Sequence, residues 1–414
     1  AIYEQVLGPT HPNTALSLHN LALLPQSQGR YSEAEPLFQR ALEISEQALG
    51  PNHPNTALSL NNLAALYQAQ GELQNALTYL SRGLVVEDTV LSQNFVGGSD
   101  TNKRDYLATM AGTTDTAISL HLSDLPNDTA AAELALTTIL QRKGRILDLF
   151  TNLRSQLAND PAALDFLNQL TATSAQLSTL SHNPSVDDTS EAYQSQRNTL
   201  QQRIRDLEDD LSRRSTEFNA LTTSPSVTEL RHSLPLHTAL VEFIRYRPFD
   251  PKAPEQSRFG EERYAAYVLK ANDTIHGVDL GSVEELEPLI KDAMFAIRTP
   301  RIRISQVKET TQTLYQELFS KLTPYLADAD HLLISPDGAL NLIPFEALVT
   351  KDGSYLVENV QISYLTSGRD LVRLQQSSQP AQLPVVMVNP IFGQPNQQAT
   401  GPYPSSLHSM SCPP

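Results

Sequence analysis

Residues Leu7–Leu24 read LGPTHPNTALSLHNLALL, and residues Leu49–Leu66 read LGPNHPNTALSLNNLAAL. The two stretches start 42 residues apart and are identical at 15 of their 18 positions. Self-similarity at a fixed period of about 20–50 residues is typical of repeat architectures, in which each unit stacks on its neighbours. Residues 1–9 also align with residues 43–51 in the same register, so we expect the chain to begin inside the second helix of an earlier unit.

Each unit is predicted to hold two helices, because apolar residues recur close to the 3.6-residue helical period. Gly71 follows the first helix of the second unit, and Gly commonly ends a helix. Two positions depart from the pattern. Pro25 stands where the second unit has Tyr67, and within a helix it is expected to cause a kink or cost about 3 kcal/mol. Gly83 stands where a small Ala is expected, which suggests an eroded array.

The two units resemble the tetratricopeptide repeat, in the longer form seen in kinesin light chains. The residues that carry the resemblance are Asn62, Leu63, Ala64, Tyr67, Gly71, Ala76 and Leu80, and in the first unit Asn20, Leu21, Ala22, Gly29, Ala34, Phe38 and Ala41. The resemblance implies that a protein or peptide binds in the groove lined by the first helices. The partner-binding residues implied by family position are His19, Asn20, Asn61, Asn62 and Gln68. A second interpretation stays open, in which the Asn pair only joins neighbouring units through hydrogen bonds.

The stretch 97–225 is rich in Leu, Ala, Gln and Thr and is predicted to form a helical linker. Helices are expected over residues 101–122, 127–153 and 161–180. Apolar residues between Tyr193 and Leu221 follow alternating steps of three and four, which is a short coiled-coil pattern. We interpret it as an intramolecular hairpin, with dimerisation as the alternative. The acidic run at Asp206–Asp210 is interpreted as a solvated face, and no metal site is expected.

After Pro225 the pattern becomes strand-like. Strands are expected over residues 239–246, 264–269, 275–280, 331–335, 360–365 and 384–388. Helices are expected over residues 282–298 and 305–326, and another is expected to start near Ser367. Strands that alternate with helices indicate a layered α/β sheet.

Three segments resemble the front of the CHAT domain, a caspase-like domain associated with tetratricopeptide repeats. They are LLISPDGALNLIPFEALV (332–349), YLVENVQISYLTSGRDLVRL (355–374) and VVMVNPIF (385–392). The resemblance implies cysteine-peptidase chemistry, in which a His takes the proton of a Cys to make a thiolate nucleophile. In the family this His, in a His-Gly step, and the Cys both follow the segment matched by Asn389-Pro390. Because the chain ends at Pro414, we expect the dyad region to be missing and assign no catalytic residue.

Two other sets of residues contain the residue types of the dyad. His276-Gly277 has the right dipeptide but lies upstream, where the family has an ordinary strand. Cys412, with His408 nearby, lies in a Pro- and Gln-rich tail whose composition does not favour a rigid site. The alternative function is therefore a residual or complemented cysteine endopeptidase that acts on a protein substrate through Cys412 or through a second chain.

Composition excludes several classes of function. The 46 acidic and 30 basic residues give a net charge of −16, which disfavours nonspecific nucleic-acid binding. A single cysteine excludes an intramolecular disulfide and a cysteine-based zinc site. We expect no membrane-spanning helix, because no uncharged apolar run reaches the necessary length. The absence of a glycine-rich phosphate loop predicts no cofactor. A cytoplasmic protein fits these features best.

The overall prediction is a multidomain chain: an α-helical repeat solenoid and a helical linker, followed by an incomplete caspase-like α/β sheet domain. The predicted parts are repeats over residues 1–96, the linker over 97–225, the N-terminal part of the CHAT domain over 226–392 and a disordered tail over 393–414. The predicted function is protein binding without catalysis. The sequence leaves the oligomeric state open.

Overall fold

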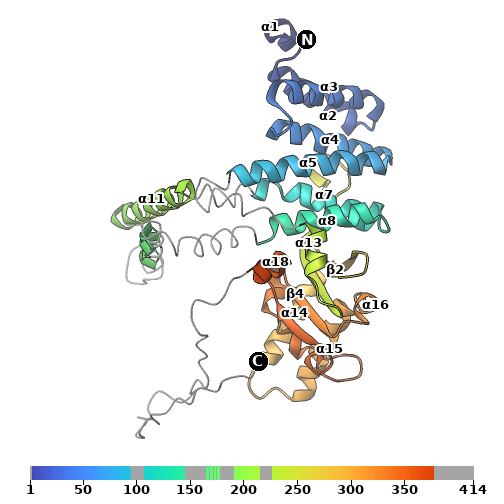
Figure 1. The fold of residues 1–414 in the computed structure, drawn as a ribbon, viewed down its shortest axis with the longest axis vertical. Helices are drawn as coiled ribbons and strands as arrows, with labels where there is room; N and C mark the ends of the chain where they lie inside the picture. The colour runs from blue at the N-terminus through green and yellow to red at the C-terminus, as the bar shows by residue number, and fades with distance from the viewer. Residues whose placement is uncertain are drawn as a thin grey trace. The chain divides into compact units, whose positions relative to one another are not determined.

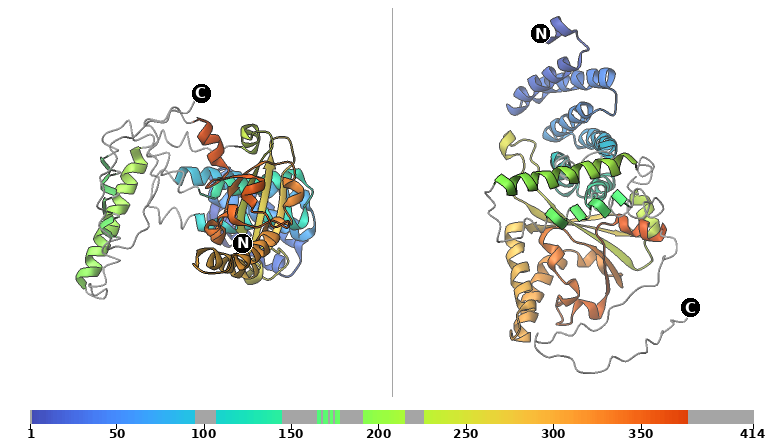
Figure 2. Two further views of the ribbon diagram at one scale, coloured as in Figure 1. Left: turned by 90° about the horizontal axis from the view of Figure 1, so that it is seen from below. Right: turned by 90° about the vertical axis from the view of Figure 1, so that its left-hand side faces the viewer.

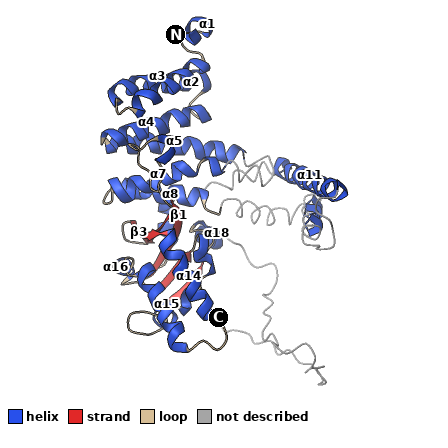
Figure 3. Ribbon diagram, turned by 180° about the vertical axis from the view of Figure 1, so that it is seen from behind, coloured by secondary structure: helices blue, strands red, loops and turns tan. Residues whose placement is uncertain are grey.

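The computed structural model describes residues 2–94, 107–144, 191–214 and 226–376, with parts of the stretch 165–177 (165–166, 168–170, 172–173 and 175–177). The expected strand 384–388, the expected tail 393–414 and Cys412 lie outside these residues. Figure 3 shows that the strands are confined to the C-terminal part, while the repeats and the described linker segments are helical. None of the described helices is both long and apolar enough to cross a membrane.

The repeat region consists of paired helices that stack in chain order (Figure 1). They are α1 (Ile2–Leu7), α2 (Pro12–Ser27), α3 (Tyr31–Leu49), α4 (Pro54–Gln70) and α5 (Leu73–Asn94). The α2–α3 and α4–α5 pairs are the two units expected from the sequence, and the helical repeat architecture is confirmed. Gly71 ends α4 in the left-handed conformation, at φ 82°, which Gly adopts with little strain.

The two units begin with the same hydrogen bonds. The Nδ1 atom of His11 accepts a bond from the Asn13 amide at 3.1 Å, and His53 accepts the equivalent bond from Asn55 at 3.1 Å. Each histidine therefore satisfies one of the backbone donors that a helix N-terminus leaves free.

An ion pair between successive second helices also recurs. Arg40 lies 2.6 Å from Glu4, and 42 residues later Arg82 lies 2.6 Å from Glu46. The recurrence shows that α1 relates to α3 as α3 relates to α5.

Pro25 does not end α2. The helix continues through Pro25 to Ser27, and the Pro side chain is buried. Only two residues follow it, so the missing N–H removes one bond from the end of the ladder and none from its middle.

The described part of the linker forms a helical hairpin and a separate helix. Its elements are α7 (Ala111–Ser119), the π-helical turn η1 (Leu120–Asp124), α8 (Thr129–Arg142) and α11 (Glu191–Arg214). Asp128 caps α8 by accepting hydrogen bonds from the amides of Ala130 and Ala131. The expected continuation of this helix to Leu153 is wrong. It ends at Arg142 because Lys143 is extended and Gly144 has a φ of 69°. Pairing of α11 as a coiled coil stays a prediction.

The C-terminal part contains a five-stranded mixed sheet. The strands are β1 (Thr238–Tyr246), β2 (Arg263–Lys270), β3 (His276–Ser282), β4 (His331–Ser335) and β5 (Gln361–Tyr364), in the order β3-β2-β1-β4-β5. β1, β4 and β5 are parallel, whereas β1, β2 and β3 are antiparallel. The remaining elements are α13 (Val227–Ser233), η2 (Glu255–Ser257), α14 (Val283–Arg298), α15 (Ile304–Phe319), α16 (Thr323–Leu326), η3 (Gly338–Leu342), η4 (Phe345–Ala347), α17 (Leu356–Asn359) and α18 (Arg369–Gln376). The predicted α/β class is confirmed.

Helices cover both faces of the sheet, and the side chains of β1 alternate between them. Ala239, Val241 and Phe243 face α14 and α15. Leu240 lies on the other face, in a core shared with α8 and α13. Figure 2 shows α14 and α15 against one side of the sheet. The linker hairpin α7–α8 thus supplies a layer of the sheet domain, and it also contributes to the repeat core through Ala117, Leu120 and Ala131.

A buried lysine attaches this hairpin to the parallel strands. The Lys143 ammonium donates to Glu242 Oε1 at 2.6 Å, to Ser335 Oγ at 2.7 Å and to the Phe243 carbonyl at 2.7 Å. Glu242 is fully buried, so the pair and its hydrogen bonds must offset the desolvation of both charges. Lys143 directly follows the last residue of α8 and therefore fixes the end of that helix on the sheet.

Candidate partner-binding groove

A cavity of about 470 Å³ lies on the face of the second repeat unit. Residues from α4, α5 and α7 line it, together with Thr109 and Met110. The rest of the lining comes from Phe249, Glu255, Arg258 and Phe259, in the loop between β1 and β2. Its lining therefore combines a repeat, the linker and the sheet domain.

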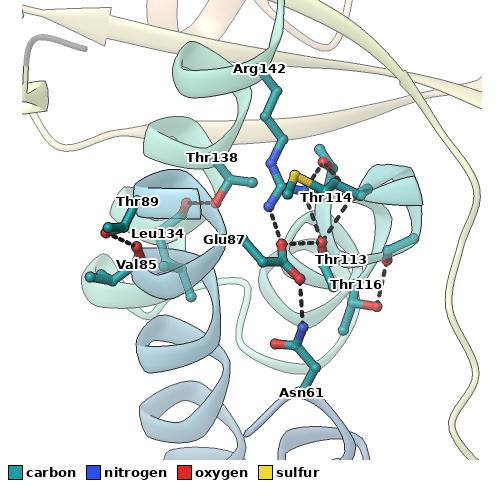
Figure 4. Close-up of polar contacts among 12 residues, drawn as sticks. Asn61, Val85, Glu87, Thr89, Thr113, Thr114, Thr116, Leu134, Thr138 and Arg142 are labelled. Carbon is teal, nitrogen blue, oxygen red and sulfur yellow. Dashed lines mark hydrogen bonds and ion pairs between the residues drawn. The ribbon is translucent and has the colours of Figure 1, made fainter. Parts of the chain in front are cut away.

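Glu87 of α5 is the centre of the polar contacts beside this cavity (Figure 4). One carboxylate oxygen accepts a hydrogen bond from Asn61 Nδ2 at 2.6 Å, and the other accepts one from the Thr113 hydroxyl at 2.8 Å. Arg142 of α8 forms an ion pair with the same carboxylate, and both side chains are only about one-tenth exposed. Arg142 also donates to the Met110 carbonyl at 2.6 Å. Four helices are thus joined through one acidic side chain.

Gly83 explains how Asn61 reaches this carboxylate. A Cβ atom at position 83 would lie 2.1 Å from Asn61 Oδ1, closer than any real contact. The Ala expected from the repeat pattern would therefore push the Asn61 amide away from Glu87. Gly83 therefore leaves room for the Asn61 amide beside Glu87, and the interpretation of the array as eroded stays a prediction.

The loop side of the cavity is held firmly against α7. The Phe249 and Phe259 rings lie 5.1 Å apart, and the backbone amide of Phe249 donates to the Ser119 hydroxyl at 2.9 Å. Arg247 pairs with Asp115 at 3.0 Å and also lies over the Phe259 ring. Burial raises the pKa of Asp115, although the contact with Arg247 opposes this effect. The Phe249 and Phe259 rings, which we call the aromatic wall of the cavity, are therefore fixed at several points.

Two family models match parts of the chain. Residues 1–44 and 22–84 match the model of the tetratricopeptide repeat, and residues 308–411 match the model of the CHAT domain. The chain combines tetratricopeptide repeats with a CHAT domain. No curated protein gives a match. The CHAT match begins inside α15 and extends to residue 411, whereas the sequence led us to expect residues 226–392. The domain limits stay a prediction.

Two of the predicted partner-binding residues lie together in the repeat groove. Asn61 and Asn62 both line the cavity. Asn62 Nδ2 donates to the Leu58 carbonyl at 2.8 Å and lies 3.5 Å from His19 Nε2 of the preceding unit. The His19 ring is buried against Phe38, and burial lowers its pKa. Asn20 is exposed on α2.

Gln68 takes a different position from the other predicted residues. Its side chain is buried, and its Nε2 atom donates to Asp124 Oδ2 in η1 at 2.6 Å. Gln68 does not line the cavity and instead attaches the second repeat to the linker. The partner-binding role of all five residues stays a prediction.

The residues that imitate the catalytic dyad do not form one in the described part of the chain. His276 stacks on Tyr325 at 4.2 Å, and Gly277 packs against His121. His121 Nδ1 lies 3.1 Å from the Tyr267 hydroxyl, and burial lowers the pKa of this histidine to about 4. The chain's one cysteine, Cys412, lies outside the described residues. Among the described residues, neither histidine therefore has a cysteine as a neighbour.

Sequence reasoning missed Glu87, Arg142 and the two loop phenylalanines. One signal for Glu87 was available, because the first unit has Ser45 at the same position and the pattern of the array changes there. Phe249 and Phe259 carried no such signal, since they lie in an irregular loop far from the repeats in sequence.

Proposed function

We propose that the tetratricopeptide repeats bind an extended segment of a partner protein in the groove formed by α2 and α4, as a binding module attached to the CHAT domain. The observation that carries this proposal is a pair of exposed leucines at equivalent positions. Leu16 is 46% exposed and Leu58 is 43% exposed. Both line a small cavity between the two units, and Leu58 also lines the larger cavity of the second unit. Because Leu16 and Leu58 share the lining of one cavity, they form a contiguous exposed apolar surface, which favours a docking site.

The polar side chains beside these leucines support the same proposal. Asn20 is exposed one turn beyond Leu16, and Asn62 lies at the equivalent position beyond Leu58. Amide side chains both donate and accept hydrogen bonds, so they suit the backbone of an extended segment. The repeated apolar and amide positions would contact successive residues of the partner.

The alternative, a cysteine endopeptidase, draws no support from residues 2–376. That part of the chain has no cysteine and therefore offers no thiolate nucleophile. The binding function is the one that the described side chains favour.

The test is a selection of binding peptides followed by a groove substitution. The full chain is used to select binders from a random peptide library displayed on phage, and the selected peptides are synthesised and titrated. We expect Leu58→Glu to weaken binding about tenfold or more, because it puts a charge against an apolar partner surface. Leu236→Glu changes another exposed leucine away from the groove and should leave affinity unchanged. Selected peptides that bind the Leu58→Glu variant with unchanged affinity would contradict the proposal.

A further inference from the structure

We propose that the cavity beside the second repeat accepts one large apolar side chain of the partner segment, between Ala65 on α4 and Phe259 on the β1–β2 loop. The inference rests on the proposed function, because it states what the same groove selects. The loop of the sheet domain would then form part of the partner site and set its specificity.

The sequence difference between the two units supports a cavity made for an occupant. Only three positions differ between residues 7–24 and 49–66, and two of them, Asn61 and Ala65, line this cavity. The first unit has His19 and Leu23 at these positions. Replacing Leu by Ala removes the outer part of an aliphatic side chain and leaves space in front of α4.

The cavities at the equivalent faces of the two units also differ in volume. Pro12, Ala15, Leu16 and His19 of the first unit line a cavity of about 10 Å³, which Ser45 and the α4 residues Asn55, Leu58 and Ser59 close. Their counterparts in the second unit, Pro54, Ala57, Leu58 and Asn61, line one of about 470 Å³. Only the second volume falls within the range of about 300–1,000 Å³ that is usual for ligand sites.

Charge complementarity favours an uncharged occupant. Glu87 is neutralised by Arg142, and the loop adds one acidic residue, Glu255, and one basic residue, Arg258. With Arg142 paired to Glu87 behind the lining, the charges around the cavity are balanced. The Phe249 and Phe259 rings, together with Leu58, provide apolar contact area of the kind that anchors a large side chain.

The aromatic wall is also preorganised, which limits the entropy that binding must offset. The Phe259 ring rests on Gly112 of α7, where a Cβ atom would approach the ring to 3.1 Å. The Asp115–Arg247 pair fixes the start of the loop at 3.0 Å. Phe259 therefore meets the partner in a defined position.

Filling the cavity tests the inference without unfolding the repeat. Ala65→Leu restores the residue that the first unit carries at this position, so the variant is compatible with the helix. We expect peptides selected from the phage-displayed random library to share a large apolar residue. Ala65→Leu should weaken their binding about tenfold or more, as should replacing that peptide residue by Ala. Phe259→Ala, which removes an aromatic ring from the lining, should weaken it to a similar degree.

The matched control is Phe295→Ala, which removes a phenylalanine that is 66% exposed on α14 and is not part of the cavity lining. Circular dichroism on each variant confirms the fold. If Leu58→Glu abolishes binding while Ala65→Leu binds as wild type, the apolar cavity is not the specificity site, although the proposed function survives. If neither substitution changes the affinity, both proposals are contradicted.

Discussion

The two repeat units have nearly the same sequence in their first helices but different neighbours. Both helices start with a histidine cap, and both units carry the Arg–Glu pair that joins successive second helices. The first unit continues the array. The second contacts the linker hairpin. There Asn61 donates to Glu87, and Gly83 leaves room for the Asn61 amide.

An identical residue shows the difference most directly. Gln26 and Gln68 occupy equivalent positions, and both are buried. Gln68 donates to Asp124 of the linker, whereas neither polar atom of the Gln26 side chain has a partner among the described residues. The repeat motif therefore provides a helix with a buried amide, and only the neighbouring element determines whether the amide is used. Shared sequence specifies the fold of the unit, and a few substitutions specify what it joins.

The largest effect should come from breaking the contact that only the second unit makes. Arg142→Met removes the cation from a buried pair and leaves the Glu87 carboxylate without it. We expect the free energy of unfolding to fall by about 3–5 kcal/mol, measured by urea denaturation. Arg82→Met removes the exposed partner of Glu46 and should lower it by less than about 1 kcal/mol. Equal losses in the two variants would show that the Glu87 contact does not distinguish the second unit.

A smaller effect should follow from making the second unit resemble the first. Ala41 is the counterpart of Gly83, and Ala normally stabilises a helix by about 1 kcal/mol relative to Gly. We expect Gly83→Ala to be destabilising instead, by about 1–3 kcal/mol, because its Cβ collides with Asn61 Oδ1. Urea denaturation of Gly83→Ala, Asn61→Ala and the double variant gives the coupling between the two sites. A stabilised Gly83→Ala protein would contradict the assigned role of the glycine.

The parts of the fold that the sequence predicted are those set by local pattern. The repeat period placed both helix pairs, and apolar runs placed β1, β2, β4 and β5. The end of α8 was missed although Gly144 marks it, because periodic apolar residues continue beyond that point. The extended backbone at Lys143 and the positive φ of Gly144 end the helix, although the apolar periodicity continues.

The candidate site was predictable only on its repeat side. Asn61 and Asn62 follow from the family positions, and both line the cavity. The pairing of Glu87 with Arg142 joins residues 55 positions apart, and Lys143 reaches Glu242 across 99. Periodicity shows which face of a helix is buried, but it does not show which element covers that face. The position of the aromatic wall beside the repeat could not be predicted for the same reason.

The smallest effect concerns the histidine that the first unit has in place of Asn61. Burial lowers the pKa of His19, so the folded protein binds a proton there less readily than the unfolded chain does. Stability must therefore fall as the pH drops below about 6.5, the ordinary pKa of histidine. His19→Asn gives the first unit the uncharged residue of the second and should reduce this loss. We expect the difference in unfolding free energy between about pH 7.5 and pH 5 to be smaller in the variant than in the wild type. Buried His121 is common to both proteins, so its contribution cancels in the comparison. An unchanged pH dependence would mean that His19 does not distinguish the acid response of the two units.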